Sequence, residues 1–184
     1  MDKTVLNKKA ISRIIARIAH EILEKNNGSK DIALVGIRTG GVFMANRLHQ
    51  MISEIDHVAV PIGELDITLY RDDLKLKKEY PTVQKTIIPF DLTSLHVVLV
   101  DDVLFTGRTI RAAMDGLIDL GRPKQIQLAV LIDRGHRELP IRPDFVGKNL
   151  PTSPTEKVDV QWEENGQEDC VIITHHVEER KQAP

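Results

Sequence analysis

The sequence predicts an α/β protein built on a parallel sheet with helices on both faces. Apolar runs rich in Val, Ile and Leu recur at Ile32–Ile37, His96–Val100 and Ile126–Ile132, and continuous runs of this kind are typical of strands buried on both faces. The first two runs each lead into a glycine-containing turn and then a segment with helical periodicity. Strands that alternate with helices in this way indicate a parallel sheet.

The composition bounds the possible functions. A length of 184 residues predicts one domain, residues 1–184, and the 41% hydrophobic and 28% charged residues are those of a soluble protein. A formal net charge of −2 restricts any nucleic-acid site to a local patch. Cys170 is the only cysteine, which excludes an internal disulfide and a cysteine metal cluster. No signal peptide or membrane span is recognisable, so we expect a cytoplasmic protein with no membrane partner.

The first helix is predicted over Lys8–Lys25. Its buried stripe consists of Ile11, Ile14, Ile15, Ile18 and Ile22. Arg13, Arg17 and His20 lie on the opposite face, and the pattern alone favours a solvated surface for them. Asn26-Asn27-Gly28 should end the helix, with Gly28 in the left-handed position.

A glycine turn follows the first buried strand. It reads Arg38-Thr39-Gly40-Gly41, and a helix over Val42–Met51 should follow it. The turn lacks the Lys-Ser/Thr end of a P-loop and the three-glycine spacing of a dinucleotide site. It could hold an anion, although alone it is better explained as a tight turn.

Two half-exposed strands are expected next, at Val58–Ile62 and Glu64–Tyr70. A polar loop of about twenty residues then spans roughly 71–93, beginning with Arg71, Asp72 and Asp73. Such a loop is either a disordered linker or a lid over a site. The strands on both sides belong to one alternating pattern, which favours a flexible lid.

The central stretch is Val97–Thr109, in which a strand leads into Asp101 and Asp102, then a turn, then a helix over Thr109–Leu120. A turn that opens a helix presents free backbone N–H groups and the positive end of the helix dipole, which suits a phosphate. The two carboxylates would repel that phosphate. They therefore indicate a neighbouring sugar diol, a metal ion, or both.

The remaining segments complete the predicted edge. Asp133–Arg137 follows the third buried strand, and ligands of open α/β sheets bind beyond the strand carboxyl ends. Turns after Ile37, Tyr70, Val100 and Ile132 should therefore meet. Beyond them, strands at Lys157–Trp162 and Asp169–Thr174 joined by Asn165-Gly166 predict a hairpin. We therefore expect the residues from about 133 to 174 to form a small C-terminal β addition, which we name the hood segment.

These features suit one class of reaction. The sequence predicts a phosphate-binding turn beside two carboxylates, a second turn that could bind an anion, and a lid. It shows no Ser/His/Asp set, nucleophilic Cys or metal-ligand cluster. The chemistry would then depend on positioning and charge stabilisation. Transfer of a sugar phosphate from a pyrophosphate leaving group fits this description.

Val97–Thr109 resembles the phosphoribosyl-pyrophosphate signature of type I phosphoribosyltransferases. The residues of this stretch most resemble those of the bacterial pyrimidine-operon regulators, which are themselves similar to uracil phosphoribosyltransferases. Further matching stretches are Arg17–Glu21, Gly63–Asp73, Asp133–Arg142, Gly147–Asn149 and Pro151–Ser153. The resemblance covers roughly residues 10–174.

The resemblance implies the type I phosphoribosyltransferase fold and conversion of uracil and 5-phosphoribosyl 1-pyrophosphate to UMP and pyrophosphate. Asp101 and Asp102 would be catalytic, with Mg²⁺ held mainly by the substrate near them and no metal site built by the protein alone. The implied phosphoribosyl site is Val97, Val98, Leu99, Val100, Asp101, Asp102, Val103, Leu104, Phe105, Thr106, Gly107, Arg108 and Thr109. Arg38, Thr39, Gly40 and Gly41 would face pyrophosphate, Arg71, Asp72 and Asp73 would belong to the lid, and Asp133, Arg134, Gly135, His136 and Arg137 would form the uracil hood.

The resemblance also implies transcription attenuation. The protein would bind an mRNA leader hairpin when UMP or UTP occupies the catalytic pocket, and it would assemble as a homodimer or a larger homo-oligomer. Candidate RNA contacts are Arg13, Arg17, His20, Arg137, Arg142 and Lys148.

Two positions depart from the family wording, because Gly40 stands where an Arg is expected and Ala16 where a Thr is expected. Three hypotheses follow: a bifunctional transferase and attenuator, an RNA-binding regulator with weak or vestigial transferase activity, and a transferase for another base without an RNA role. A receiver-type phosphorylation domain also has an acidic pair after a strand, but it would not explain Thr106–Thr109 or the long loop.

Overall fold

The computed structural model describes residues 3–72 and 84–175. The chain begins with β1 (Lys3–Asn7), α1 (Lys8–Asn26), β2 (Ile32–Ile37), α2 (Gly40–Asp56), β3 (Ile62–Leu65) and the 3₁₀ turn η1 (Thr68–Tyr70). It continues with β4 (His96–Leu104), α3 (Arg108–Leu120), β5 (Gln125–Asp133), β6 (Phe145–Asn149), β7 (Glu156–Gln161), the 3₁₀ turn η3 (Glu163–Asn165) and β8 (Cys170–His175). Within these ranges, every helix is too short or too polar to cross a membrane.

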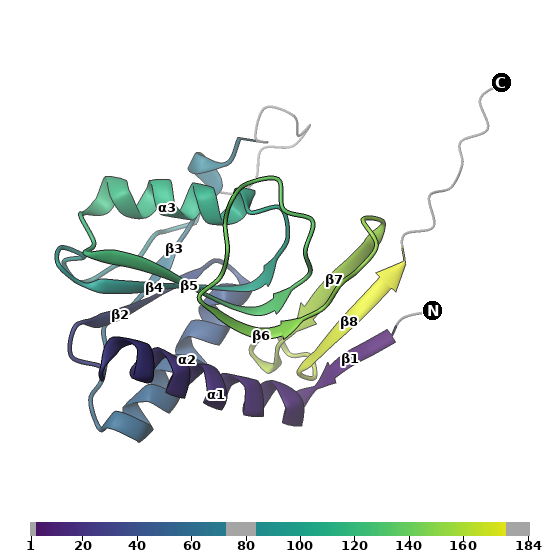
Figure 1. The fold of residues 1–184 in the computed structure, drawn as a ribbon, viewed down its shortest axis with the longest axis horizontal. Coiled ribbons are helices and arrows are strands. Elements are labelled where there is room, and N and C mark those ends of the chain that lie inside the picture. The colour runs from purple at the N-terminus through teal and green to yellow at the C-terminus, as the bar shows by residue number, and fades with distance from the viewer. Residues whose placement is uncertain (1–2, 73–83, 176–184) are drawn as a thin grey trace.

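The main sheet has five parallel strands in the order β3-β2-β4-β5-β6 (Figure 1). α1 and α2 cover one face, where Ile18 and Leu48 are fully buried. α3 covers the other face and buries Ile110 and Leu117 against β2 and β4. The parallel sheet with helices on both faces is confirmed, and its carboxyl ends lie at one edge, as predicted.

A second sheet of three antiparallel strands, β1-β8-β7, packs beside the first (Figure 1). The predicted hairpin is confirmed as β7 and β8, although its connection spans η3 with Gly166 at φ 76°. Two strands were not predicted. β1 completes the small sheet from the N-terminal end, and β6 lies within the expected hood segment but is the fifth strand of the main sheet.

The prediction of strands over Val58–Ile62 and Glu64–Tyr70 was wrong. One strand, β3, spans part of this region, and η1 follows it. The reason is local, because the Asp66 carboxylate accepts hydrogen bonds from the Thr68 backbone N–H at 2.9 Å and the Thr68 hydroxyl at 2.6 Å. This Asx turn ends the strand, and Leu69 is left 71% exposed.

The predicted helices are confirmed with small changes at their ends. The Ala10 N–H donates to the Asn7 side chain at 3.0 Å, which caps α1. Asn27, at φ 55°, takes the left-handed position that we expected for Gly28, which follows with φ 105°. α2 begins at Gly40 rather than Val42, so the glycine turn is itself the first turn of that helix.

Candidate functional site

The acidic pair lies on β4, just before its carboxyl end. Asp101 is 7% exposed and Asp102 is half-buried. The Asp102 backbone N–H donates to Asp101 Oδ1 at 3.0 Å. Burial and the neighbouring Asp102 charge raise the pKa of Asp101 well above its ordinary value, and burial also raises that of Asp102. Two carboxyl groups held this way favour a bound cation or a developing positive charge.

A phosphate-sized cavity follows the acidic pair. It has a volume of about 200 Å³ and is lined by Arg71, Asp72 and Val103–Ile110. Gly107, at φ 92°, is in the left-handed region that favours glycine, and α3 begins at the next residue. The free N–H groups of the first turn of this 13-residue helix lie at the cavity, as an anion site requires.

Arg108 connects this cavity to two other segments. Its guanidinium donates to Asp72 at 2.7 Å and to Glu138 at 2.6 Å. Arg71 and Asp72 are the first two residues of the expected lid, and both line this cavity, so the segment predicted to be the lid starts beside the phosphate turn. Of that lid, Asp73 and the rest of residues 73–83 lie outside the described residues.

The glycine turn lies directly against the acidic pair. A Cβ built on Gly40 would lie 1.9 Å from Asp102 Oδ2, and one on Gly41 would lie 2.3 Å from the Val100 carbonyl oxygen. The Arg38–Thr39 peptide bond is cis. The Arg38 guanidinium pairs with Glu64 at 2.5 Å and donates to Gln84 at 3.0 Å. Sequence reasoning brought the turn and the pair to one edge, but it missed their direct contact.

The hood segment is built around two arginines. Arg137 donates to the Phe105 carbonyl at 2.7 Å, the Ile141 carbonyl at 3.0 Å and the Asp133 carboxylate at 2.5 Å. It thereby fixes the hood to the phosphate turn. With these bonds made, its guanidinium is largely committed inside the protein, although we also listed it as a candidate RNA contact.

Arg134 is only 6% exposed, and it connects the start of the hood segment to the residues just before β7. Its guanidinium lies 4.1 Å from the Phe105 ring centroid and donates to the Ser153 and Glu156 carbonyls at 3.1 and 2.6 Å. The His136 ring packs edge-on against Phe105, 5.8 Å between centroids. Together these segments line a second cavity of about 970 Å³, large enough for a base and part of its ribose.

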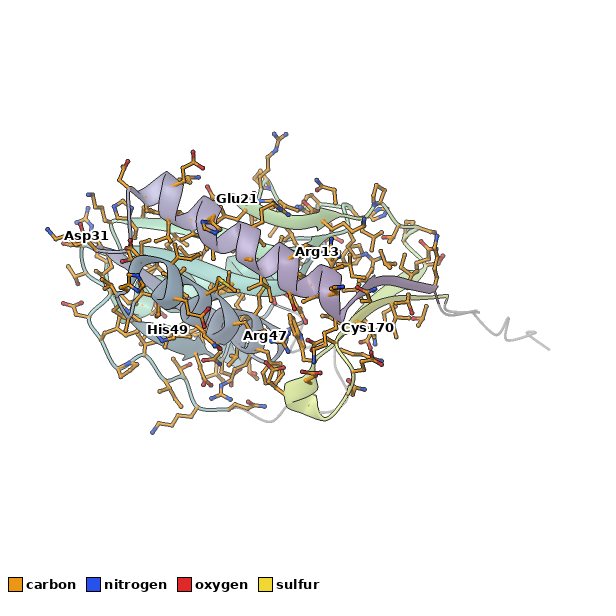
Figure 2. All side chains as sticks on the ribbon, turned by 90° about the horizontal axis from the view of Figure 1, so that it is seen from below. Arg13, Glu21, Asp31, Arg47, His49 and Cys170 are labelled. Carbon is orange, nitrogen blue, oxygen red and sulfur yellow. The ribbon has the colours of Figure 1, made fainter. Side chains whose placement is uncertain are left out.

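The other candidate RNA contacts lie away from the phosphate cavity. Arg13 and His20 are exposed on α1, and Figure 2 views the molecule from the side of this helix. Arg17 pairs with Glu21 at 2.6 Å and donates to the Val146 and Gly147 carbonyls of β6 at 3.0 and 2.7 Å. Arg142 and Lys148 are exposed just before and on β6. The structure therefore brings Lys148 close to the α1 face.

The chain matches the family model described as phosphoribosyl transferase domain over residues 2–165. A bifunctional protein PyrR of Listeria monocytogenes serotype 4b is 57% identical over 92% of this chain and 94% of its own length. The PyrR of Chloroflexus aurantiacus is 58% identical over 94% of both chains.

Solved structures agree on the fold. The hypoxanthine phosphoribosyltransferase of Trypanosoma cruzi superposes with a TM-score of 0.70 over 94% of this chain and 96% of that chain, at 17% identity. A purine phosphoribosyltransferase of Pyrococcus horikoshii gives a TM-score of 0.60 at 28% identity, over 81% of this chain and 88% of that chain.

Proposed function

Because the chain belongs to the phosphoribosyltransferase family, we propose that it converts uracil and 5-phosphoribosyl 1-pyrophosphate to UMP and pyrophosphate, and that it regulates pyrimidine genes by nucleotide-dependent binding to leader mRNA. The close approach of the glycine turn to the acidic pair is the observation that supports the proposal most, because the residues proposed for the pyrophosphate lie directly beside those proposed for the ribose. The high identity with bifunctional PyrR proteins supports both roles.

In this reaction the substrate's 5′-phosphate occupies the cavity at Phe105–Thr109, held by backbone N–H groups and the Thr106 and Thr109 hydroxyls. Asp101 and Asp102 accept hydrogen bonds from the ribose hydroxyls. Their charge stabilises the positive charge that develops on the anomeric carbon as pyrophosphate leaves. The hood holds uracil over that carbon, and the loop beginning at Arg71 keeps water away.

Mg²⁺ fits this site in one way. Among the described residues, no three His, Cys, Asp or Glu side chains gather to hold a metal. The buried Asp101 and half-buried Asp102 carboxyl groups would nevertheless suit a magnesium ion whose other ligands come from substrate oxygens and water. When bound, the ion neutralises charge on the departing pyrophosphate. We therefore place it beside Asp101 and Asp102 with the substrate.

Weak transferase activity remains the second candidate, because a specific observation favours it. Gly40 supplies no cation to pyrophosphate, and Arg38 is already engaged with Glu64 and Gln84. A lost charge-assisted hydrogen bond weakens the transition state by roughly 1.5–3 kcal/mol, or about tenfold to 150-fold.

Assays of UMP formation on three chains separate these readings: the natural chain, Gly40→Ala and Gly40→Arg. We expect measurable activity in the natural chain. Gly40→Ala should lose about tenfold or more, because its Cβ displaces the Asp102 carboxylate. Gly40→Arg should lose as much. A natural chain near background that Gly40→Arg restores would instead indicate an RNA-binding regulator with vestigial catalysis.

RNA binding is tested by gel shift with the leader RNA of the pyrimidine genes, with and without UMP. We expect Arg13→Ala and His20→Ala each to weaken binding by about tenfold, since both side chains are exposed on α1. Arg122→Ala is the matched control, because Arg122 is exposed beyond the end of α3, on the other side of the sheet. If no RNA binds in either condition, the chain is a transferase without an RNA role. The expected homo-oligomer stays a prediction.

A further inference from the structure

The larger of the two cavities, which we name the hood cavity, lies outside the proposed phosphoribosyl site. Its volume is about 970 Å³, and the described residues that line it include none that line the phosphate cavity. Asp101 and Asp102 are not among them either. The uracil of the transferase reaction must lie beside those carboxylates, at the anomeric carbon. A ligand that fills the hood cavity is therefore one that the reaction does not use.

Leu139 and Ile141 form a wall between the two cavities. Both line the hood cavity, and both pack against the phosphate turn, since a Cβ built on Gly107 would lie 3.4 Å from Ile141 Cδ1 and 3.5 Å from Leu139 Cβ. The Thr106 carbonyl accepts hydrogen bonds from the backbone N–H groups of Glu138 at 3.0 Å and Leu139 at 3.2 Å. The wall of the hood cavity is thus bonded directly to the turn proposed to hold the 5′-phosphate.

The hood cavity has mainly apolar walls. Aliphatic and proline side chains make up these walls: Leu139, Pro140, Ile141, Pro143, Val146 and Pro151. Asp133 is the one acidic side chain in the described lining, and it is already paired with Arg137 at 2.5 Å. Walls of this kind suit the flat face of a nucleobase, and the volume has room for the ribose as well.

Two exposed cations lie beside these walls. Arg142 lines the hood cavity, and Lys148 follows Val146 by two residues on β6, so both of these β6 side chains lie on one face of the sheet. Neither cation makes an ion pair with any residue that the structure describes. An apolar cavity flanked by unpaired cations fits a base that is attached to a phosphate backbone, as in the unpaired loop of an RNA hairpin.

Val146 also connects the hood cavity to the candidate RNA face. Its side chain lines the cavity, while its carbonyl accepts a hydrogen bond from Arg17 of α1 at 3.0 Å. β6 is the edge strand of the main sheet, so the cavity and α1 flank the same edge. An RNA strand that lies on α1 therefore reaches the cavity across a single strand.

We propose that the hood cavity binds one unpaired base of the leader RNA, turned out of its hairpin, while Arg142 and Lys148 contact the flanking phosphates. The proposal rests on the proposed RNA function and names one contact of that function. A nucleotide in the phosphate cavity orders the turn to which the cavity wall is bonded. Bound UMP should therefore strengthen the capture of this base.

Abasic substitution of the leader hairpin, one unpaired position at a time, tests the proposal. Removal of the bound base should weaken binding by about 5- to 100-fold at one position. The salt dependence of binding should stay the same there, because every phosphate is kept. UMP should strengthen the binding of the intact hairpin more than that of this abasic hairpin. If every abasic hairpin bound like the intact one, the proposal would be overturned while the RNA function would stand.

Val146→Ala tests the cavity from the side of the protein, because it removes two methyl groups from the wall. It should weaken the binding of the intact hairpin about fivefold and leave the binding of the sensitive abasic hairpin unchanged. Val160→Ala is the matched control, since Val160 is a half-buried valine of β7 outside the cavity lining. Equal losses for the intact and the abasic hairpin would show that the base binds elsewhere.

Two further measurements use only the natural chain. The fluorescence of 2-aminopurine at the sensitive RNA position should rise on binding, because the base leaves its stacked neighbours for a cavity whose described lining contains no Phe, Tyr or Trp. Unchanged emission would overturn the proposal even if Val146→Ala failed to fold. Equilibrium dialysis without RNA should find one UMP per chain. A second bound UMP that the hairpin displaces would assign the hood cavity to free nucleotide instead.

Discussion

The burial of Asp101, one of the two proposed catalytic residues, lowers the stability of the folded protein at neutral pH. Burial and mutual repulsion raise the pKa of Asp101 well above its ordinary value. In the unfolded chain an Asp ionises near pH 4, so between that pH and the raised folded pKa the folded state binds more protons. The free energy of unfolding contributed by this group therefore falls as pH rises through that interval.

Asp101→Asn should accordingly stabilise the protein at neutral pH while abolishing UMP formation. We expect a thermal midpoint higher by roughly 2–4 °C at pH 7, which corresponds to about 1 kcal/mol for a chain of this size. The gain should vanish near pH 3, where the aspartate is protonated in both states. An equal gain at both pH values would show that charge burial is not the cause.

Individual site residues could be predicted from the sequence where their role depends on residues adjacent in the chain. The acidic pair and the phosphate turn at Thr106–Thr109 could be predicted from a few neighbouring residues, whereas the α1 cations became candidates only through the family resemblance, because their pattern alone favours a solvated face. The contact between Gly40 and Asp102 could not be predicted, because these residues lie on different elements whose approach depends on the strand order.

Among the elements, the buried strands were predicted well and the short exposed ones poorly. β2, β4 and β5 are continuous apolar runs, which leave little doubt about their conformation. β1 and β6 are five residues each and contain Lys and Asn, so tertiary pairing rather than propensity makes them strands. The Asp66 side chain ends β3 early, although the alternating pattern continues to Leu69.

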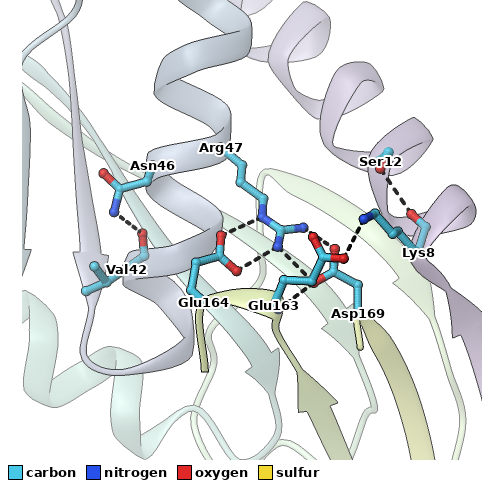
Figure 3. A network of polar contacts seen from close by, with 8 residues as sticks. All are labelled: Lys8, Ser12, Val42, Asn46, Arg47, Glu163, Glu164 and Asp169. Carbon is cyan, nitrogen blue, oxygen red and sulfur yellow. Dashed lines mark hydrogen bonds and ion pairs between the residues drawn. The ribbon is translucent and has the colours of Figure 1, made fainter. Parts of the chain in front are cut away.

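The ion pair between Arg47 of α2 and Asp169 of the C-terminal hairpin (Figure 3) should contribute to the stability of the fold. The Asp169 side chain is 2% exposed and pairs with Arg47. Burial alone would raise the pKa of Asp169, but hydrogen bonds from Arg47 and the Glu163 backbone N–H lower it below its ordinary value. Arg47→Met leaves this carboxylate buried and unpaired, which should cost about 3–5 kcal/mol in urea unfolding at pH 7.

Asp169→Asn in the Arg47→Met background is the matched test, because it removes the buried negative charge that Arg47→Met leaves without its cation. We expect the double variant to be clearly more stable than the sum of the two single changes implies. Strict additivity would mean that the pair contributes nothing specific to docking the hairpin.

For the whole molecule, the two proposed activities occupy different surfaces that share one structural connection. The proposed nucleotide site lies at the carboxyl edge of the sheet, and the candidate RNA face lies on α1. Arg17 of α1 donates to the backbone of β6, and β6 pairs with the end of β5 at Asp133, where the hood begins. We therefore propose that a nucleotide bound under the hood changes the RNA affinity of the α1 face through β6.

Reciprocal titration is the most direct test of the proposal that one chain couples a uridine-nucleotide site to an RNA site. Calorimetry would measure UMP binding with and without the leader RNA, and gel shift would measure RNA binding with and without UMP. Linkage requires both affinities to rise by the same factor, typically about 5- to 150-fold. Equal UMP affinity in the presence and absence of bound RNA would contradict the claim.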